Sequence, residues 1–213
     1  MNKTKDAIFE SAIKIFSNRG YTGATMDEIA INAGVAKGTL YYHFKSKEEI
    51  FKYIISEGMN IVSEQIDEVI QIEESPIEKL RGVCKVQLGV VNKNRDFFKV
   101  VMSQLWGQEL RQSELRDTIK NYIKHIENYL KEAIKVGYIM ESETSFMAYT
   151  FFGTICSAAV YELIYGESSN VDDVIEKVMS YILHGISVWC KHLNSKIENK
   201  DKLKIHEYIN MHK

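Results

Sequence analysis

The sequence has few of the residues that interrupt helices or cross-link a chain. Its 213 residues include one proline and three cysteines. With so little proline, long helices can run without a break. Cys84, Cys156 and Cys190 are too few and too widely spaced for a disulfide framework or a metal knuckle. We therefore expect reduced thiols, a cytoplasmic location and no structural metal.

Membrane spans, a signal peptide and enzyme motifs are also missing from the sequence. No uninterrupted apolar run reaches the roughly 18 residues of a membrane span, and the polar start Met1–Asp6 is not followed by the apolar core of a signal peptide. The six histidines form no H-E-x-x-H spacing. No phosphate-binding glycine loop or nucleophile elbow is present. We expect a protein that needs no cofactor, does not enter a membrane and is not an enzyme.

Apolar residues recur at helical spacing along the chain, without the alternation of strands or an internal repeat. Cap and stop signals therefore predict an all-α fold of about nine helices. The first ends at Gly20. The others span about residues 25–33, 36–44, 47–72, 76–92, 96–107, 113–137, 142–165 and 170–193, and a short helix can follow in the polar tail.

The segment Thr25–Phe44 is the most informative part of the chain. Thr25 and Glu28 have the spacing of a capping box, in which each side chain bonds the backbone of the other. Gly34 can adopt the left-handed conformation that ends a helix, and a second helix begins near Ala36. Two short helices joined by such a turn are typical of a DNA-reading helix-turn-helix.

Flanking helices supply the core that two short helices need. Ser46 and Glu49 form a second capping box, which opens a long helix. We divide the chain into a helix-turn-helix DNA-binding domain, residues 1–52, and a ligand-binding and dimerisation domain, residues 53–213. The first carries a net charge of +2 and the second −4, which favours orientation of the basic end toward DNA. The expected core of the head comprises Ile8, Phe16, Ile29, Leu40, Phe44, Ile50 and Phe51.

The head closely resembles the N-terminal DNA-binding domain of the tetracycline-repressor (TetR) family of bacterial transcription regulators. The resemblance extends to about residue 55. It implies an all-helical C-terminal domain, a homodimer and release from DNA when a small ligand binds. The matching segments are Ala12–Phe16, Gly20–Tyr21, Thr25–Met26, Ile29–Ala30, Ala33–Val35, Lys37–Phe44 and Lys45–Glu48.

Nine residues are our candidates for DNA contacts, from their chemistry and from the resemblance. Backbone N–H groups at the start of the second short helix favour phosphate or base acceptors, and hydroxyl, imidazole and ammonium groups can bond phosphates. We expect one of the two tyrosines to be half-buried, and we rank Tyr42 ahead of Tyr41 as a DNA contact. His43 either contacts DNA or caps its helix, and the lysines are either contacts or solvated charges. The nine are Thr25, Lys37, Gly38, Thr39, Tyr41, Tyr42, His43, Lys45 and Lys47.

A cavity in the body is expected to bind the effector. Aromatic and methionine side chains with few polar groups suit an apolar or amphipathic small molecule. The segments Gln104–Trp106 and Gln108–Arg116 look similar to the corresponding region of family members that respond to fatty-acyl compounds. A multidrug-like cation is the alternative effector. The expected lining comprises Met59, Gln87, Phe98, Met102, Trp106, Tyr122, Tyr149 and Phe152.

The last two long helices are apolar on nearly all sides, so both need cover on all sides. We expect a four-helix interface of a homodimer within residues ~143–193 of both subunits; the alternative is a monomer that buries both helices internally. Two reading helices about 34–36 Å apart would require a near-palindromic operator.

Together these features predict a ligand-responsive, DNA-binding transcription regulator. We expect a homodimeric repressor that leaves a palindromic double-stranded operator when a small-molecule effector binds. The alternative is a helical adaptor or interaction protein without DNA binding. The intact segment Lys37–Lys47 argues against that alternative.

Overall fold

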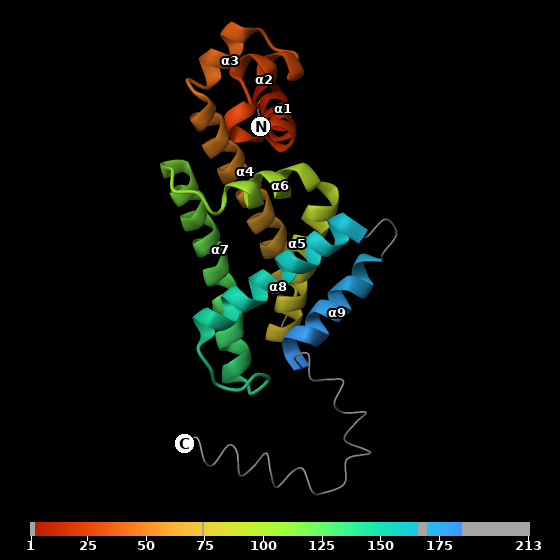
Figure 1. The fold of residues 1–213 in the computed structure, drawn as a ribbon. Helices are drawn as coiled ribbons and strands as arrows, with labels where there is room; N and C mark the ends of the chain where they lie inside the picture. The colour runs from red at the N-terminus through yellow and green to blue at the C-terminus, as the bar shows by residue number, and fades with distance from the viewer. Residues whose placement is uncertain (1–2, 74, 166–169, 185–213) are drawn as a thin grey trace, which may run out of the picture.

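The computed structural model describes residues 3–73, 75–165 and 170–184, and this part of the chain is helical throughout (Figure 1). It confirms the all-α class and the expected order of helices. The described residues form α1 (Lys3–Gly23), α2 (Met26–Asn32), α3 (Lys37–His43), α4 (Lys47–Ile70), α5 (Pro76–Lys93), α6 (Arg95–Gln104), α7 (Leu110–Lys135), α8 (Thr144–Tyr165) and α9 (Val171–His184).

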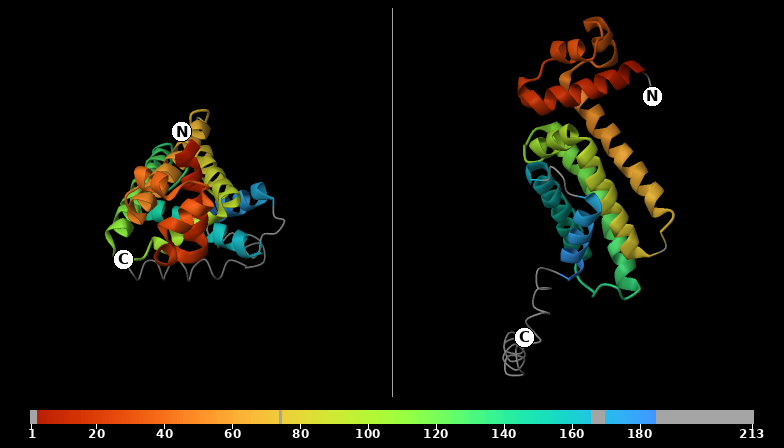
Figure 2. Two further views of the ribbon diagram at one scale, coloured as in Figure 1. Left: turned by 90° about the horizontal axis from the view of Figure 1, so that it is seen from above. Right: turned by 90° about the vertical axis from the view of Figure 1, so that its right-hand side faces the viewer.

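A small head of α1–α3 sits at one end of a longer helical body, and α4 runs from the head into the body (Figures 1 and 2). All seven residues of the expected head core are buried. The capping box is formed, since Glu28 N donates to Thr25 Oγ1 at 3.2 Å and Thr25 N donates to Glu28 Oε2 at 3.1 Å. Gly34 has φ +66°, as a left-handed turn requires. Gly20, at φ 69°, breaks the helical path within α1 as expected.

The second capping box is only half formed. Ser46 Oγ accepts from Glu49 N at 3.2 Å, which satisfies one free amide of the first turn of α4. The Glu49 carboxylate instead accepts from the N–H of Lys45, one residue before the cap, at 2.6 Å. The sequence motif therefore located the start of the helix but not the full pattern of hydrogen bonds.

The start of α7 differs from the prediction. The helix begins at Leu110, earlier than the expected Ser113, because Glu109 and Gln112 form a capping box that we did not recognise. An acidic cap lacks the usual Ser or Thr signal. The expected end of the last helix near Leu193 and the tail helix lie outside the described residues.

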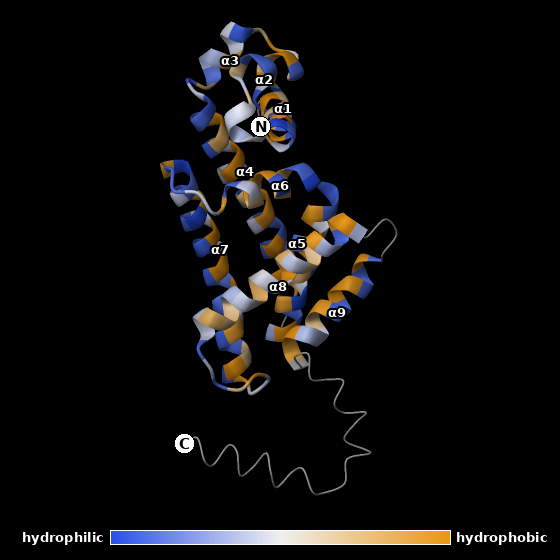
Figure 3. Ribbon diagram, viewed as in Figure 1, coloured by the Kyte–Doolittle hydropathy of each residue, from blue (hydrophilic) through white to orange (hydrophobic). Residues whose placement is uncertain are grey.

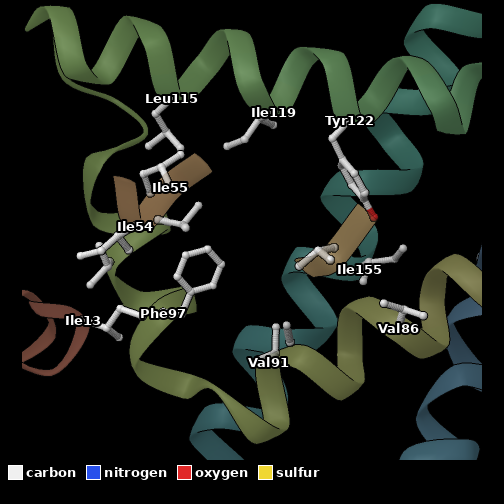
Figure 4. Packing of buried hydrophobic residues seen from close by; sticks show 14 of the residues in the cluster. Ile13, Ile54, Ile55, Val86, Val91, Phe97, Leu115, Ile119, Tyr122 and Ile155 are labelled. Carbon is white, nitrogen blue, oxygen red and sulfur yellow. The ribbon is translucent and has the colours of Figure 1, made fainter. Parts of the chain in front are cut away.

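The body is built around α5, which packs against α4, α7, α8 and α9. Figure 4 shows buried apolar side chains from several helices meeting in its interior, among them Ile54, Phe97, Leu115, Ile119 and Tyr122. The head rests on the body through α1, which packs on α6. Any change in the position of α6 therefore acts directly on the head.

Helix α8 carries apolar residues on all sides (Figure 3). Within the described residues it alone is long and apolar enough, by length and composition, to cross a membrane. Scattered polar residues such as Thr150 and Ser157 interrupt its apolar runs, so the expectation that no segment could span a membrane is corrected on this point. A helix that a partner helix covers can have the same length and apolar composition. Its exposed apolar residues are Phe146, Tyr149, Val160, Tyr161, Ile164 and Tyr165.

Candidate nucleic-acid interface and effector cavity

Helix α3 has a buried side and an exposed side. Leu40 and Phe44 are buried in the head, as the i, i+4 spacing predicts. Tyr42 is 77% exposed and Tyr41 39%, the order that we expected. His43 is half-buried, and its ring meets the Tyr42 ring edge-on at 5.1 Å. The core residues thus fix the helix so that its tyrosines face outward.

The start of α3 presents exposed backbone and one paired cation. Lys37 Nζ donates to Asp27 Oδ2 at 2.8 Å, and this hydrogen bond raises the pKa of the exposed lysine. A Cβ on Gly38 would meet open space, so the backbone there is accessible. Thr39 beside it is half-buried. The ion pair holds Lys37 beside the α2–α3 turn.

Two more of the nine candidates take part in hydrogen bonds within the head. Thr25 Oγ1 accepts from Glu28 N and donates to Glu28 Oε2 at 3.0 Å. Lys45 Nζ donates to the carbonyl of Tyr41 at 3.1 Å, but Lys45 is exposed. Lys45 can exchange its bond for a phosphate at the surface, whereas Thr25 would have to leave its cap.

Lys47 has a role that neither sequence-based alternative foresaw. Its Nζ donates to the carbonyls of Thr22 and Ala24 at 3.2 and 2.9 Å, and it lies 4.7 Å from the centre of the Tyr21 ring. Partial burial lowers the pKa of this lysine. Lys47 therefore ties α4 to the end of α1 and is not a freely solvated charge.

Several polar contacts join the head to the body, among them a Lys52–Glu114 ion pair at 3.0 Å, and the sequence predicted none of them. The guanidinium of Arg111 in α7 lies 3.8 Å from the centre of the Tyr21 ring, and its Nε is buried without a hydrogen-bond partner. Ser17 Oγ in α1 donates to Asp96 Oδ1 in α6 at 2.7 Å. These residues are far apart in sequence and match no local motif, so only the tertiary structure brings them together.

An apolar cavity of about 60 Å³ lies in the body among α4, α5, α6, α7 and α8. Six of the eight expected residues line it: Met59, Gln87, Phe98, Met102, Tyr122 and Phe152. Trp106 and Tyr149 do not, and placing them there was wrong. Trp106 is 84% exposed just after the end of α6, and Tyr149 is 52% exposed on the outer side of α8. Aromatic character alone could not tell these surface positions from the cavity wall.

A buried row of three polar groups crosses the cavity wall. Tyr122 donates its hydroxyl to Gln87 Oε1 at 3.0 Å, and Gln87 Nε2 donates to Cys156 Sγ at 3.7 Å. Burial raises the pKa of the Tyr122 hydroxyl and raises that of the Cys156 thiol to about 12. The side-chain amide of Gln87 carries two N–H groups, and the bond to Cys156 uses one of them.

In the part of the chain that the structure describes, no three His, Cys, Asp or Glu side chains are grouped to hold a metal ion. Cys84 and Cys156 are both buried free thiols, and Cys190 lies outside the described residues.

Comparison with known proteins places these features in context. A family model described as bacterial regulatory proteins, tetR family, matches residues 8–54. The fatty acid metabolism regulator protein of Bacillus subtilis (strain 168) is 27% identical over 186 residues, covering 84% of this chain and 93% of that protein. The structure of a candidate fatty acid metabolism regulator of Clostridium perfringens is 50% identical, with a TM-score of 0.79 over 84% of this chain and 98% of that one.

A third comparison concerns the fold. The transcriptional regulator FadR of Bacillus subtilis, solved in complex with stearoyl-CoA, gives a TM-score of 0.76 at 24% identity, covering 85% of this chain and 98% of that one.

Proposed function

The chain belongs to the TetR family of bacterial transcription regulators, and we propose that it is a homodimeric repressor released from a palindromic operator by a fatty-acyl compound. As a member of this family it is a DNA-binding regulator and not an enzyme. The proposal places it in the cytoplasm, where the bacterial chromosome lies. Residues 1–52 act as its DNA-binding domain and residues 53–213 as its ligand-binding and dimerisation domain.

The outward face of α3 carries the DNA-binding part of the proposal. Buried Leu40 and Phe44 hold the helix while exposed Tyr42 presents a hydroxyl to the groove or the phosphates. Lys37, Gly38, Thr39, Tyr41, His43 and Lys45 complete the surface. Thr25 and Lys47 act mainly by fixing the head, because their polar atoms already bond within it. An adaptor would have no need of this exposed polar face.

The exposed stripe of α8 supports the proposed dimer. Gly153 and Ser157 are exposed near its middle, and a Cβ on Gly153 would meet no other atom. Small residues flanked by exposed Tyr149, Val160 and Ile164 let a second helix approach closely. In the proposed homodimer, α8 and α9 of each subunit form a four-helix interface that buries this face. The described part of residues ~143–193 contains both helices.

The apolar cavity carries the effector part of the proposal. Since no acidic residue lines it, a cationic drug would find no counter-charge there, whereas an acyl chain needs none. At about 60 Å³ the cavity is smaller than the roughly 300–1,000 Å³ of most ligand pockets. A long chain therefore requires side chains such as Met59 and Met102 to move, and methionine adapts readily. The relatives that act in fatty acid metabolism favour the same class of effector.

Selection of genomic DNA by the purified protein, followed by fluorescence anisotropy, tests the proposal. We expect a near-palindromic operator, and roughly tenfold or more weaker binding when palmitoyl-CoA is saturating. Tetraphenylphosphonium serves as the cationic comparison and should have no effect. Failure to enrich any DNA sequence would favour the adaptor, and release by the cation alone would replace the acyl compound as effector.

A further inference from the structure

Asp27 adds a negative charge to the part of the head that we assign to DNA. Between Met26 and His43 the acidic residues are Asp27 and Glu28, both in the first turn of α2. The Glu28 carboxylate is engaged in the capping box with Thr25, whereas Asp27 takes no part in that cap. A carboxylate close to DNA repels the phosphates, so its presence at this surface needs a physical reason.

Asp27 is paired with the first residue of the proposed reading helix, α3. Lys37 Nζ donates to Asp27 Oδ2 at 2.8 Å, and this bond joins α2 to α3. The side chains of Lys37 and Asp27 are 64% and 55% exposed, so the pair lies at the surface of the head. The Lys37 ammonium also lies 6.0 Å from the centre of the Tyr41 ring. A donor and an acceptor thus lie side by side at the start of α3.

The pair has groups left for a second partner. An ammonium carries three N–H donors and a carboxylate can accept about four hydrogen bonds, while the bond between the two side chains uses one donor and one acceptor position. Lys37 and Asp27 can therefore each bind a further polar atom without separating. The partner must then offer an acceptor beside a donor.

The edge of a G·C base pair in the major groove offers that combination. Guanine presents the acceptors N7 and O6, and cytosine presents its N4 amino donor next to them. Lysine donates to guanine N7 and O6, and aspartate accepts from cytosine N4. The 2.8 Å between Lys37 Nζ and Asp27 Oδ2 is an ordinary hydrogen-bond length, as is the separation of guanine O6 and cytosine N4 within the base pair. The spacing and polarity of the protein pair therefore match this edge.

We propose that Asp27 is a specificity-determining residue, which reads one G·C base pair in each half of the operator together with Lys37. This inference rests on the proposed function, because it requires α3 to enter the major groove. On DNA of another sequence Lys37 has to leave Asp27 to reach a phosphate, and the carboxylate then faces the backbone without its cation. At the G·C pair both groups keep partners of opposite polarity. Asp27 thus weakens binding to wrong sequences more than binding to the operator.

The alternative is a purely structural Asp27. An acidic residue in the first turn stabilises a helix through the helix dipole, and α2 is a helix of seven residues. Loss of such a role would change the affinity for every DNA sequence by the same factor. Loss of a reading role would change the base preference at one position of each half-site.

Selection of duplexes from a randomised DNA library by the full chain tests the proposal. Fluorescence anisotropy then compares the selected duplex with one in which A·T replaces the G·C pair. The variants are Asp27→Asn, Lys37→Ala and the two combined. The matched control is Glu10→Gln, which also removes one exposed carboxylate from the head. Glu10 lines a groove of about 820 Å³ between α1 and the α5–α6 junction, on the side of the head that faces the body.

We expect the wild type to select a G·C pair at one position of each half-site and to bind the A·T duplex roughly tenfold more weakly. Asp27→Asn should reduce this ratio to roughly threefold and leave the preferences at other positions unchanged. Lys37→Ala should remove the preference, and the double variant should match Lys37→Ala, because the two residues act as one unit. The control should keep the wild-type ratio.

Three results would overturn the role of Asp27 while the DNA-binding function stands. These are an unchanged ratio in Asp27→Asn, an equal change in its affinity for both duplexes, and an Asp27→Asn effect of the same size when Lys37 is already alanine. A wild type that enriches no DNA sequence would overturn both this role and the proposed function.

Discussion

The guanidinium carbon of Arg111 lies 3.8 Å from the centre of the Tyr21 ring, and this contact links α7 of the body to the C-terminal end of α1 in the head. The ammonium of Lys47 lies 4.7 Å from the centre of the same ring. Two cations thus share one aromatic ring, and burial together with repulsion from Arg111 lowers the pKa of Lys47. The ring of Tyr21 attracts both cations while the cations repel each other. The strength of this contact therefore depends closely on the relative position of head and body.

Replacing Arg111 by alanine should weaken the coupling between effector and operator. We expect the ratio of operator affinities without and with palmitoyl-CoA to fall by roughly fivefold, because a cation–π contact of about 0.5–2 kcal/mol is lost. Affinity for each ligand alone should change little. Anisotropy titrations of DNA at several effector concentrations measure this ratio, with Lys120→Ala as the control. An unchanged ratio would show that the joint does not transmit the signal.

Tyr42→Ala should lower operator affinity by roughly tenfold, since the side chain is 77% exposed on the reading face and supports no core contact. Tyr138→Ala, which removes an exposed tyrosine of the body, is the control. Fluorescence anisotropy at one fixed salt concentration gives both affinities. If Tyr42→Ala binds like the wild type, the DNA surface lies elsewhere.

Lys47→Ala and Lys45→Ala should separate stability from DNA binding. Loss of Lys47 leaves the carbonyls of Thr22 and Ala24 without their donor, so we expect a loss of about 1–3 kcal/mol in the free energy of unfolding. Lys45 is exposed, and its removal should cost less than about 0.5 kcal/mol while weakening operator binding. Urea unfolding followed by circular dichroism measures the difference. Equal stabilities would mean that Lys47 is a solvated charge after all.

The reactivity of the Cys156 thiol, which lines the cavity, should report on binding of the effector. Burial raises the pKa of Cys84 and Cys156 from 9.0 to about 12, so both should react slowly with iodoacetamide at pH 8, because only the thiolate attacks. Palmitoyl-CoA should slow the reaction of Cys156, which lines the cavity, but not that of Cys84. Peptide mass spectrometry in a Cys190→Ser background distinguishes the two sites. Equal protection, or none, would argue against an acyl chain in this cavity.

The same thiols predict a loss of stability in alkali. A raised native pKa means that the folded state keeps a proton that the unfolded chain releases. The contribution of each thiol to stability is therefore complete below pH 9 and is lost as the pH rises toward about 12. Chemical unfolding at pH 8 and pH 10 should show this decrease, and Cys84→Ala with Cys156→Ala should reduce it. A decrease of the same size in the double variant would assign it to other groups.

Charges placed on the exposed stripe of α8 should separate the proposed dimer. We expect Val160→Glu with Ile164→Glu to sediment as a monomer at micromolar concentration, since paired carboxylates cannot be buried in an apolar interface without a large cost. Ile72→Glu with Met140→Glu, at exposed apolar positions outside α8, should leave the dimer intact. Sedimentation velocity measures both. A monomeric wild type would exclude the interface.

The local signals of the sequence were the most accurate. Thr25 with Glu28 and Gly34 placed the turn between α2 and α3 because caps and left-handed turns depend on residues a few positions apart. Leu40 and Phe44 were recognised as core by the same short spacing. The acidic cap at Glu109 was missed because it lacks the Ser or Thr that usually marks a helix start.

The cavity could be predicted only in part. Apolar character identified Phe98, Met102 and Phe152, but Trp106 looked equally suitable and lies on the surface. Composition shows which residue types can line a cavity, while the rotation and end point of each helix decide which residues face inward. Tyr149 illustrates this, since it lies on the exposed side of α8, three residues before Phe152 on the cavity wall.

Local sequence patterns were enough to predict the all-helical class, the helix-turn-helix and the face that α3 turns outward, since each depends on hydrogen bonds and apolar spacing within a few turns of helix. The packing of the helices was needed to show that Lys47 bonds inside the head, that Arg111 contacts Tyr21, and that Phe97 lines both the apolar cavity and the groove between α1 and α6. Those contacts join residues distant in sequence, and their geometry is set by how whole helices pack. No local pattern encodes that packing.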